Sequence, residues 1–348
     1  MRHYIIPLFI PHAGCPHTCV FCNQRRITGV ATTVTPADIQ RILEFHMRQI
    51  TRPYCVEAAF YGGSFTALPF TVQKQLLQPT AAYLADGRLQ AVRLSTRPDC
   101  IDESILTLLR RSGVQTIELG AQSFDDSVLR AAGRGHTAAA IRRAAGLIRA
   151  YGFALGIQLM PGLPGDTEQS MMQTLQETLA LRPDCVRIYP TLVLRGTRLA
   201  DLYQAHRFTP LSMETAVSIA AHMKLAFERA GIRVIRTGLQ SSPELDAGDT
   251  VLAGPYHPAF GEMVENCIFA AMVEKVLSGF SGIRGPVVLH HVAKDTSKLR
   301  GMKNCNMKRW QAAYPQADFL CRPDGQAAGC LQIEYQGNWH EVTRESLP

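Results

Sequence analysis

The sequence predicts an α/β fold, with a partial TIM barrel of about six strand–helix units followed by a small α+β domain. Two observations support this prediction. Short β-rich runs alternate with longer helix-like segments through the first 240 residues, which is typical of parallel strands joined by crossover helices. Motifs rich in cysteine, glycine and polar residues follow one run after another, as expected where functional groups gather at the carboxyl ends of barrel strands. The alternation alone would also fit a doubly wound sheet, and the motif positions favour the barrel.

The barrel elements can be assigned in order along the chain. The predicted strands are residues 4–12, 57–62, 91–96, 116–121, 153–160, 185–190 and 233–239. A helix is predicted after Thr35, which is a suitable N-cap, with Pro36 in the first turn. Another is predicted from Asp102 to a stop at Gly113. Six or seven such units are too few for a closed eight-stranded barrel, so the predicted barrel is partial.

The strand–helix alternation ends near residue 240. Residues 239–262 are rich in Gly, Pro and Ser, and we interpret them as a linking or capping segment. An apolar helix is predicted over residues 263–280, followed by a β-like run, a basic turn, a helix and two further β-like runs. We therefore predict a barrel domain over residues 1–245 and a basic α+β domain over residues 246–348.

Composition narrows the class of protein. Of the 348 residues, 46% are hydrophobic and 19% charged, which favours a folded core over disorder. The net charge of +7 permits an anionic partner such as RNA without requiring one. No run approaches the roughly 18 apolar residues that a membrane span needs, so we expect no membrane association. The chain is neither short nor signal-bearing, so its ten cysteines predict reduced thiols in a cytoplasm rather than disulfides.

Three cysteines, Cys15, Cys19 and Cys22, fall within eight positions in "CPHTCVFC". A structural zinc site would need a fourth ligand, such as His12 or His17, and such sites usually pair two Cys-x-x-Cys knuckles. No second knuckle is visible in the sequence. The proline, glycine and histidine residues around the thiols argue against three packed core cysteines. A 4Fe-4S cluster held by three thiolates keeps one iron open for a reactant, and the spacing favours this cluster over zinc.

The Cys-x-x-x-Cys-x-x-Cys spacing resembles the hallmark of the radical S-adenosylmethionine (SAM) superfamily. Residues 118–137, 158–167 and 187–199 resemble the radical SAM part of the catalytic subunit of Elongator, a tRNA wobble-uridine modification enzyme. Oxygen-independent coproporphyrinogen oxidase is a more distant resemblance. The likeness covers roughly residues 4–240 and does not extend to Elongator's acetyltransferase domain, so carboxymethylation of the wobble uridine is not implied.

The resemblance implies specific roles for residues at the strand ends. Cys15, Cys19 and Cys22 would ligate the 4Fe-4S cluster, whose open iron binds SAM. The implied SAM contacts are Phe21 near the adenine, Gly62, Gly63 and Ser64 at the amino group, Gln122 and Arg134 at the ribose and carboxylate, and Ser95 and Gln158. Ser95 and Gln158 both depart from the superfamily pattern, in which acidic residues are frequent at these positions.

The implied chemistry is a reductive cleavage of SAM to methionine and a 5'-deoxyadenosyl radical, which takes a hydrogen atom from a substrate. A flavodoxin- or ferredoxin-type protein would supply the electron. We expect an RNA substrate, most simply tRNA. Two alternatives stay open: a small metabolite or tetrapyrrole as substrate, and a zinc and RNA module without enzymatic activity. The sequence singles out no catalytic acid or radical-quenching residue.

The C-terminal part supplies the reason to expect RNA. Between Lys294 and Arg309 there are six basic residues and one acidic residue, a local charge of +5. Residues 299–310 resemble the Gly-x-x-Gly turn of KH modules, which clamps a nucleic-acid backbone, with Asn304 in place of the second glycine. The candidate RNA contacts are Lys298, Arg300, Lys303 and Lys308. A solvated basic face on a small cap domain is the alternative.

Overall fold

The computed structural model describes residues 2–10, 12–23, 34–51, 54–325 and 327–347. The chain forms two compact units: unit 1 is residues 1–212 and 232–256, and unit 2 is residues 213–231 and 257–348. Unit 2 thus takes one helix, α10 (Met213–Arg229), from within the predicted barrel segment. The predicted domain boundary near residue 245 is a statement about which parts of the chain fold independently. The division into compact units does not test it, so it stays a prediction.

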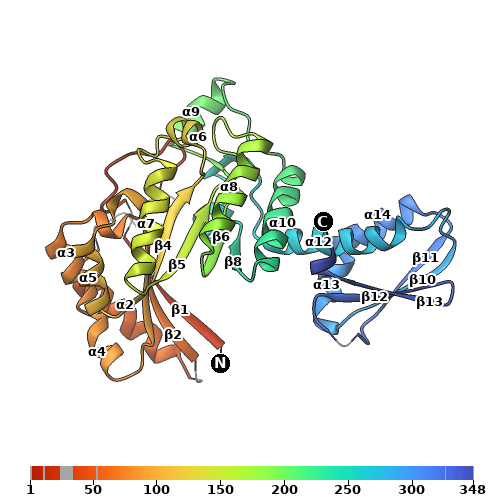
Figure 1. The fold of residues 1–348 in the computed structure, drawn as a ribbon, viewed down its shortest axis with the longest axis horizontal. Helices are drawn as coiled ribbons and strands as arrows, with labels where there is room; N and C mark the ends of the chain where they lie inside the picture. The colour runs from red at the N-terminus through yellow and green to blue at the C-terminus, as the bar shows by residue number, and fades with distance from the viewer. Residues whose placement is uncertain (1, 11, 24–33, 52–53, 326, 348) are drawn as a thin grey trace. The chain divides into compact units, whose positions relative to one another are not determined.

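Seven parallel strands form the main sheet of unit 1, in the order β1-β2-β3-β4-β5-β6-β8 (Figure 1). Their bounds are Arg2–Phe9 (β1), Tyr54–Tyr61 (β2), Ala91–Thr96 (β3), Val114–Gln122 (β4), Ala154–Leu159 (β5), Cys185–Ile188 (β6) and Arg233–Thr237 (β8). Each predicted run overlaps one of these strands, and β1, β2 and β4 begin two or three residues before their predicted bounds. The spatial order follows the chain order, whereas a doubly wound sheet reverses at a switch point. The predicted partial TIM barrel is therefore confirmed.

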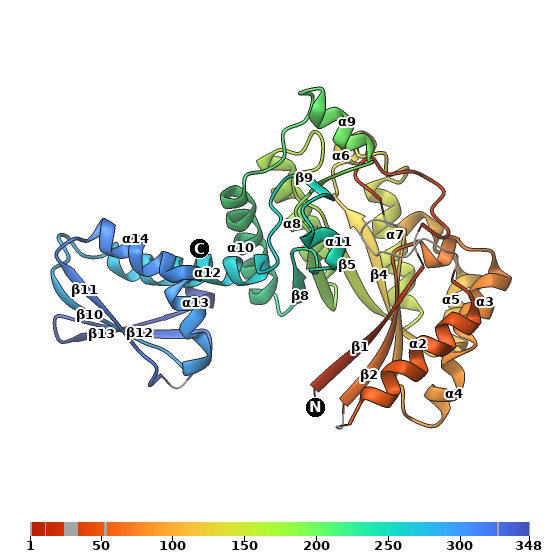
Figure 2. The same cartoon turned by 180° about the vertical axis from the view of Figure 1, so that it is seen from behind.

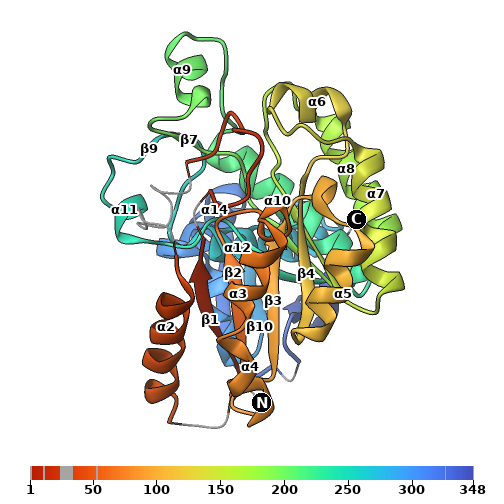
Figure 3. The same cartoon turned by 90° about the vertical axis from the view of Figure 1, so that its left-hand side faces the viewer.

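Helices connect the strands and pack against them. Their bounds are Pro36–Gln49 (α2), Phe70–Leu77 (α3), Thr80–Ala85 (α4), Glu103–Arg111 (α5), Asp126–Ala131 (α6), Ala138–Ala150 (α7), Glu168–Leu181 (α8) and Arg198–Gln204 (α9). Figures 2 and 3 show α2 beside β1, and α5 and α7 beside β4. Thr35 caps α2 in a capping box with Asp38, and Asp102 caps α5, so both predicted helix starts are confirmed.

The two faces of the main sheet differ in chemistry because successive side chains of a strand point to opposite faces. One face is apolar and buried, and it forms the core of unit 1. Examples are Ile6 and Leu8 on β1, Phe60 on β2, Leu94 on β3 and Ile117 on β4. The opposite face carries polar and charged side chains, among them Tyr61, Arg93 and Glu118.

Residues 239–256 of the segment predicted to be a linker are part of unit 1, and residues 257–262 belong to unit 2. The segment contains the short helix α11 (Pro243–Asp246) and strand β9 (Val251–Ala253). Strand β9 pairs antiparallel with β7 (Val193–Leu194), and Leu245 packs in an apolar cluster with Leu192 and Leu194. The Gly- and Pro-rich segment is therefore a folded part of the structure with its own helix and strand, and not an extended linker.

Unit 2 combines helices with a four-stranded sheet in the order β11-β10-β12-β13. The strands are Gly285–His290 (β10), Ala317–Arg322 (β11), Cys330–Tyr335 (β12) and Asn338–Thr343 (β13), and the helices besides α10 are Phe260–Leu277 (α12), Thr296–Arg300 (α13) and Cys305–Ala313 (α14). Three strands follow α14 instead of the two β-like runs predicted. The reason is the pair Gln336 and Gly337, whose φ angles of 50° and 75° form a two-residue hairpin turn.

None of the helices in the described part of the chain is long and apolar enough to cross a membrane.

Candidate cofactor site

The three clustered cysteines lie in the loop after β1, and the turn after β2 shapes this loop. The backbone N–H of His12 donates to the carbonyl of Gly62, with an N···O distance of 2.9 Å. The N–H of Ser64 donates to the carbonyl of Ala13, also at 2.9 Å. The loop is therefore held against the carboxyl end of β2 by main-chain hydrogen bonds, as two adjacent parallel strands allow.

Two glycines make this approach possible. Gly14 has a φ of +74°, and a Cβ at this position would overlap the carbonyl oxygen of Ser64. A Cβ at Gly63 would lie 2.5 Å from the carbonyl oxygens of Ile10 and Ala13. Real Cβ atoms do not approach backbone so closely, so only glycine fits at either position. The turn at Gly62 and Gly63, called the Gly-Gly turn below, thus packs directly on the cysteine loop.

The three thiols differ in exposure: Cys15 is exposed, Cys22 is half-buried and Cys19 is buried. Nη1 of Arg134 donates to Sγ of Cys19, with an N···S distance of 3.1 Å. The pKa of the Cys15 thiol is raised, first because surrounding protein atoms displace water and second because of the Cys19 sulfur. The positive charges of Arg97 and Arg134 act on this pKa in the opposite direction.

Arg97 and Arg134 are themselves fixed by neighbours. Arg134 donates from Nη2 to the carbonyl of Gly120 and from Nε to Nε2 of His136, the latter at 3.3 Å. Arg97 makes two hydrogen bonds of 3.0 Å to the carboxylate of Asp99 and also donates to the carbonyl of Arg134. Neither Arg97 nor His136 was among the predicted site residues. The signal for Arg97 was its place directly after a predicted strand, in "STRPD".

His136 is held neutral. Burial and then the charges of Arg134 and Arg97 lower the pKa of its imidazole to about 3. Its Nε2 accepts from Arg134, so the ring proton is on Nδ1. Nδ1 has no partner at full hydrogen-bond geometry among the described residues, although the backbone of Thr137 acts weakly on the ring and His136 is only 6% exposed. The site therefore contains a buried N–H donor that an acceptor of a bound molecule could satisfy.

The ends of β4 and β5 add two amides. Gln122 is buried and has a φ of 71°, a left-handed conformation that is uncommon for a residue with a side chain. Nε2 of Gln158 donates to Oε1 of Gln122 at 3.3 Å. A Cβ on Gly120 would lie 2.9 Å from the Gln122 amide nitrogen and 3.3 Å from Arg134, so the structure brings both of these side chains together over Gly120.

The other predicted cofactor contacts lie nearby in sequence but differ in setting. Ser64 is buried, and its hydroxyl bonds to Thr96 at 3.1 Å and accepts from the backbone of Arg97 at 3.2 Å. Ser95, the neighbour of Thr96, points to the opposite, polar face of β3 and is half-buried. Phe21 is buried in an apolar cluster with Val20, Cys19 and side chains from four later segments: Val128, Ala132, Leu163, Val193, Leu199 and Ala200.

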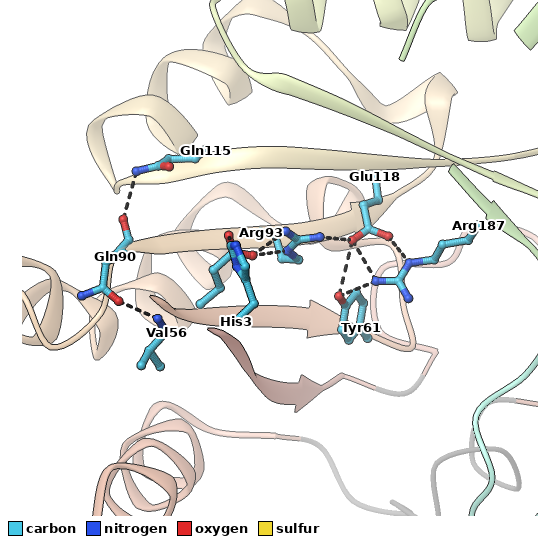
Figure 4. Close-up of polar contacts among 9 residues, drawn as sticks. His3, Val56, Tyr61, Gln90, Arg93, Gln115, Glu118 and Arg187 are labelled. Atoms are coloured by element: carbon cyan, nitrogen blue, oxygen red, sulfur yellow. Dashed lines mark hydrogen bonds and ion pairs between the residues drawn. The ribbon is translucent and has the colours of Figure 1, made fainter. Parts of the chain in front are cut away.

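The polar face of the main sheet carries a charge network that sequence reasoning missed (Figure 4). The carboxylate of Glu118 accepts from Arg93 at 3.2 Å, from Arg187 at 3.1 Å and from the Tyr61 hydroxyl at 3.4 Å. Arg93 also pairs with Glu57. Burial, and then the charge of Glu118, raises the pKa of Tyr61. The sequence signal for this network was the glutamate inside the β-rich run "TIELGA", because a charged side chain that is buried in a sheet needs a partner of opposite charge.

One group of side chains outside the cysteine loop comes close enough to share a metal ion, whereas the three thiols of the loop do not all lie within 4.8 Å of one another. In the described ranges, His3, Cys55 and Glu57 place one potential ligand atom each within 4.8 Å of one another. They lie near the amino ends of β1 and β2, and Glu57 is already paired with Arg93.

The predicted RNA contacts lie on and around a turn between α13 and α14. The turn contains Gly301, Lys303 and Asn304, with φ angles of 74°, 54° and 60°. Arg300 donates from Nε to Oδ1 of Asn304 at 2.9 Å, and Arg300, Lys303 and Lys308 are exposed. Lys298 is instead half-buried and pairs with Asp295 at 2.8 Å and with Glu265 at 3.8 Å. Its charge is offset within unit 2.

Comparison with known proteins agrees with these features. Residues 9–178 match the family model described as Radical SAM superfamily, and residues 183–269 match the model described as Radical_SAM C-terminal domain. A tRNA uridine(34) acetyltransferase of Methanocaldococcus jannaschii is 32% identical over 143 residues, which are 40% of this chain and 26% of that protein. Elongator complex protein 3 of Homo sapiens is 31% identical over 201 residues, 52% of this chain and 37% of that protein.

The fold also has a solved counterpart. The structure of archaeal Elp3 from Methanocaldococcus infernus, lacking residues 1–46, superposes with a TM-score of 0.62 and 20% identity, over 95% of this chain and 73% of that one. At this identity the likeness concerns the fold. The two family models together span most of the chain, and the first includes the cysteine loop, the Gly-Gly turn and the ends of β4 and β5. The chain therefore belongs to the radical SAM superfamily of enzymes.

Proposed function

We propose that this protein modifies tRNA, using a 4Fe-4S cluster at Cys15, Cys19 and Cys22 and a SAM molecule bound at the open iron. The observation that carries the proposal is the cysteine loop itself, which is fixed on the Gly-Gly turn with a buried thiol facing an arginine. When bound, the two cofactors supply a one-electron cleavage of SAM to methionine and a 5'-deoxyadenosyl radical, which can remove a hydrogen atom from a substrate.

The protein atoms around the thiols suit an anionic iron–sulfur group. Thiolates are the form of cysteine that binds metals, and nearby positive charge favours them. Arg97 and Arg134 both act on the Cys15 thiol, and Arg134 donates to Cys19. Three thiolates on one short loop match the number of protein ligands that would keep one iron of a 4Fe-4S cluster open.

The strand ends supply groups suited to SAM. The turn at Gly62 and Gly63 lies against the cysteine loop, and we place the amino group of SAM at its main-chain groups. Gln122 and Gln158 offer amide groups for the ribose hydroxyls, and Arg134 offers a guanidinium for the carboxylate. To the predicted set we add His136, because its Nδ1–H is buried without a partner at full hydrogen-bond geometry among the described residues. Phe21 and Ser95 keep their proposed places near SAM.

The substrate proposal rests on the relatives and on unit 2. A tRNA uridine(34) acetyltransferase and an Elongator complex protein 3 are among the curated relatives, and this chain spans 26% and 37% of their lengths. Exposed cations at Arg300, Lys303 and Lys308 suit contacts with phosphates. A flavodoxin- or ferredoxin-type protein would reduce the cluster. All ten cysteines are free thiols, which fits a cytoplasmic location.

The cofactor proposal is tested by an anaerobic assay. The protein is reconstituted with iron and sulfide, given SAM and dithionite, and 5'-deoxyadenosine is quantified. The matched variants replace three cysteines each: C15A/C19A/C22A in the loop, and C55A/C267A/C330A among half-buried thiols elsewhere. We expect product from the wild type and the second variant and none from the first. A colourless, zinc-loaded protein after anaerobic purification would contradict the proposal.

The substrate proposal is tested by binding of bulk tRNA at several salt concentrations. We expect R300E/K303E/K308E to weaken binding at least tenfold and to reduce the slope of log K against log salt by up to about 3. The control K74E/R143E/R207E makes the same charge change at exposed positions of unit 1. Equal tRNA binding by the two variants would contradict an RNA substrate and would favour a small metabolite or tetrapyrrole.

A further inference from the structure

We infer that Arg134 donates a hydrogen bond to the Cys19 thiolate of the cluster and thereby raises the reduction potential of that cluster. The inference rests on the proposed cluster site and goes beyond it, since it gives Arg134 a role in electron transfer in addition to a contact with SAM.

The contact between Arg134 and Cys19 is short, buried and held in place by neighbouring groups. The Nη1 to Sγ distance is 3.1 Å, which is short for a hydrogen bond to sulfur, and Arg134 and Cys19 are 6% and 7% exposed. The guanidinium is oriented from two further sides, by the carbonyl of Gly120 and by Nε2 of His136. Arg97 holds the main chain of the same residue through the Arg134 carbonyl. A donor fixed in this way does not need to reorganise when the charge of its acceptor changes.

The effect on the cluster follows from charge. Reduction adds one electron to the cluster and its thiolates, and hydrogen bonds to the sulfurs are among the factors that set the reduction potential. A positive charge at hydrogen-bond distance stabilises the more negative, reduced state, and it does so more strongly in a site with little water. Removing Arg134 would therefore lower the reduction potential and make the cluster harder to reduce.

Three of the five guanidinium N–H groups have partners among the described residues, namely Cys19, Gly120 and His136. Two are left for a carboxylate, so the contact with Cys19 is compatible with the proposed contact with SAM.

The test is a potentiometric titration of the reconstituted cluster without SAM, followed by electron paramagnetic resonance. The variants are R134Q, which removes the charge, and R134K, which keeps a charge on a more flexible stem. The control is R130Q, which removes an exposed arginine of α6. We expect R134Q to lower the ratio of reduced to oxidised cluster about tenfold at a fixed potential, which is 59 mV for a one-electron couple. R134K should be intermediate, and R130Q should match the wild type.

The outcomes separate this inference from the proposed function. If the wild type assembles no cluster, the proposed function fails. If clusters assemble with equal iron and sulfide contents and R134Q has the potential of R130Q, the proposed function stands and the inference is overturned. If R134Q holds no cluster, the inference is tested instead on wild-type protein labelled with ¹⁵N in its arginine side chains. Pulsed resonance of the reduced cluster must then show a coupling to ¹⁵N, and its absence overturns the inference.

Discussion

The strand ends and polar face of unit 1 and the basic turn of unit 2 both gather positive charge, but they use it differently. Four arginines at the strand ends and on the polar face of unit 1 are largely or fully buried, and they donate hydrogen bonds to carboxylates, carbonyls or sulfur. They are Arg93, Arg97, Arg134 and Arg187. In unit 2, Lys303 and Lys308 are exposed. Buried charges must be paired to be tolerated, whereas exposed ones contribute little to stability. We infer that the first set fixes a structure and the second is available to a partner.

The largest effect should come from breaking the buried network at Glu118. Replacing it by alanine leaves Arg187 without its carboxylate, and removing one partner of a buried pair costs roughly 3–5 kcal/mol. E57A is the matched control, because Arg93 then keeps Glu118. Urea unfolding measures both free energies of unfolding. An E118A variant no less stable than E57A would show that the network is not a structural element.

The next effect should come from the contact between the two loops. Gly14→Ala adds a left-handed penalty of about 1–2 kcal/mol and an overlap with Ser64 that costs roughly 1–3 kcal/mol more. Gly87→Ala is the control, since Gly87 has a φ of +75° with nothing within 4 Å of an added Cβ. We expect G14A alone to lose cluster binding, measured as iron per chain after reconstitution. Equal iron contents would mean that the loop adapts without this contact.

A smaller effect should appear as a pH dependence. The pKa of His136 is about 3 in the folded protein and about 6.5 in an unfolded chain, so the unfolded chain takes up the proton first as pH falls. Stability from this residue is therefore complete above pH 6.5 and decreases toward pH 3. Between pH 7 and pH 5 the loss should be about 2 kcal/mol. The measurement is the difference in unfolding free energy between wild-type and H136Q apoprotein, and a difference that does not change with pH would contradict it.

The smallest effect on stability should come from the basic turn. K303E changes an exposed side chain, so the free energy of unfolding should change by less than about 0.5 kcal/mol. Its tRNA affinity should nevertheless fall, and fall less as salt is raised, because phosphate contacts are screened. Thermal unfolding beside tRNA binding at two salt concentrations gives both values. If K303E is destabilised but binds tRNA normally, Lys303 has a structural role and is not a contact for a partner.

The parts of the fold that were predictable from sequence are those with local signals. The seven strands were predictable because each is a short β-rich run, and Thr35 and Asp102 are N-caps whose partners lie within three residues. The hairpin at Gln336 was missed because glutamine rarely takes a positive φ, so the run read as one strand.

The candidate site was predictable only in part. The cysteine loop and the Gly-Gly turn could be named because their spacing is itself the signal. The contacts of Arg134 with Cys19 and of Glu118 with Arg187 could not, because each joins residues that are distant in sequence and meet only in the folded sheet. The assignment of individual residues to SAM or to RNA stays a prediction.

The packing of the cysteine loop on the turn after β2 also sets an order of events during synthesis. The loop takes its shape from Gly63 and Ser64, which leave the ribosome well after the cysteines do. That shape exists only once β1 has paired with β2. A cluster at these thiols would therefore be assembled on a folded sheet edge and not on a nascent peptide, so iron content after reconstitution would report on the folding of this edge.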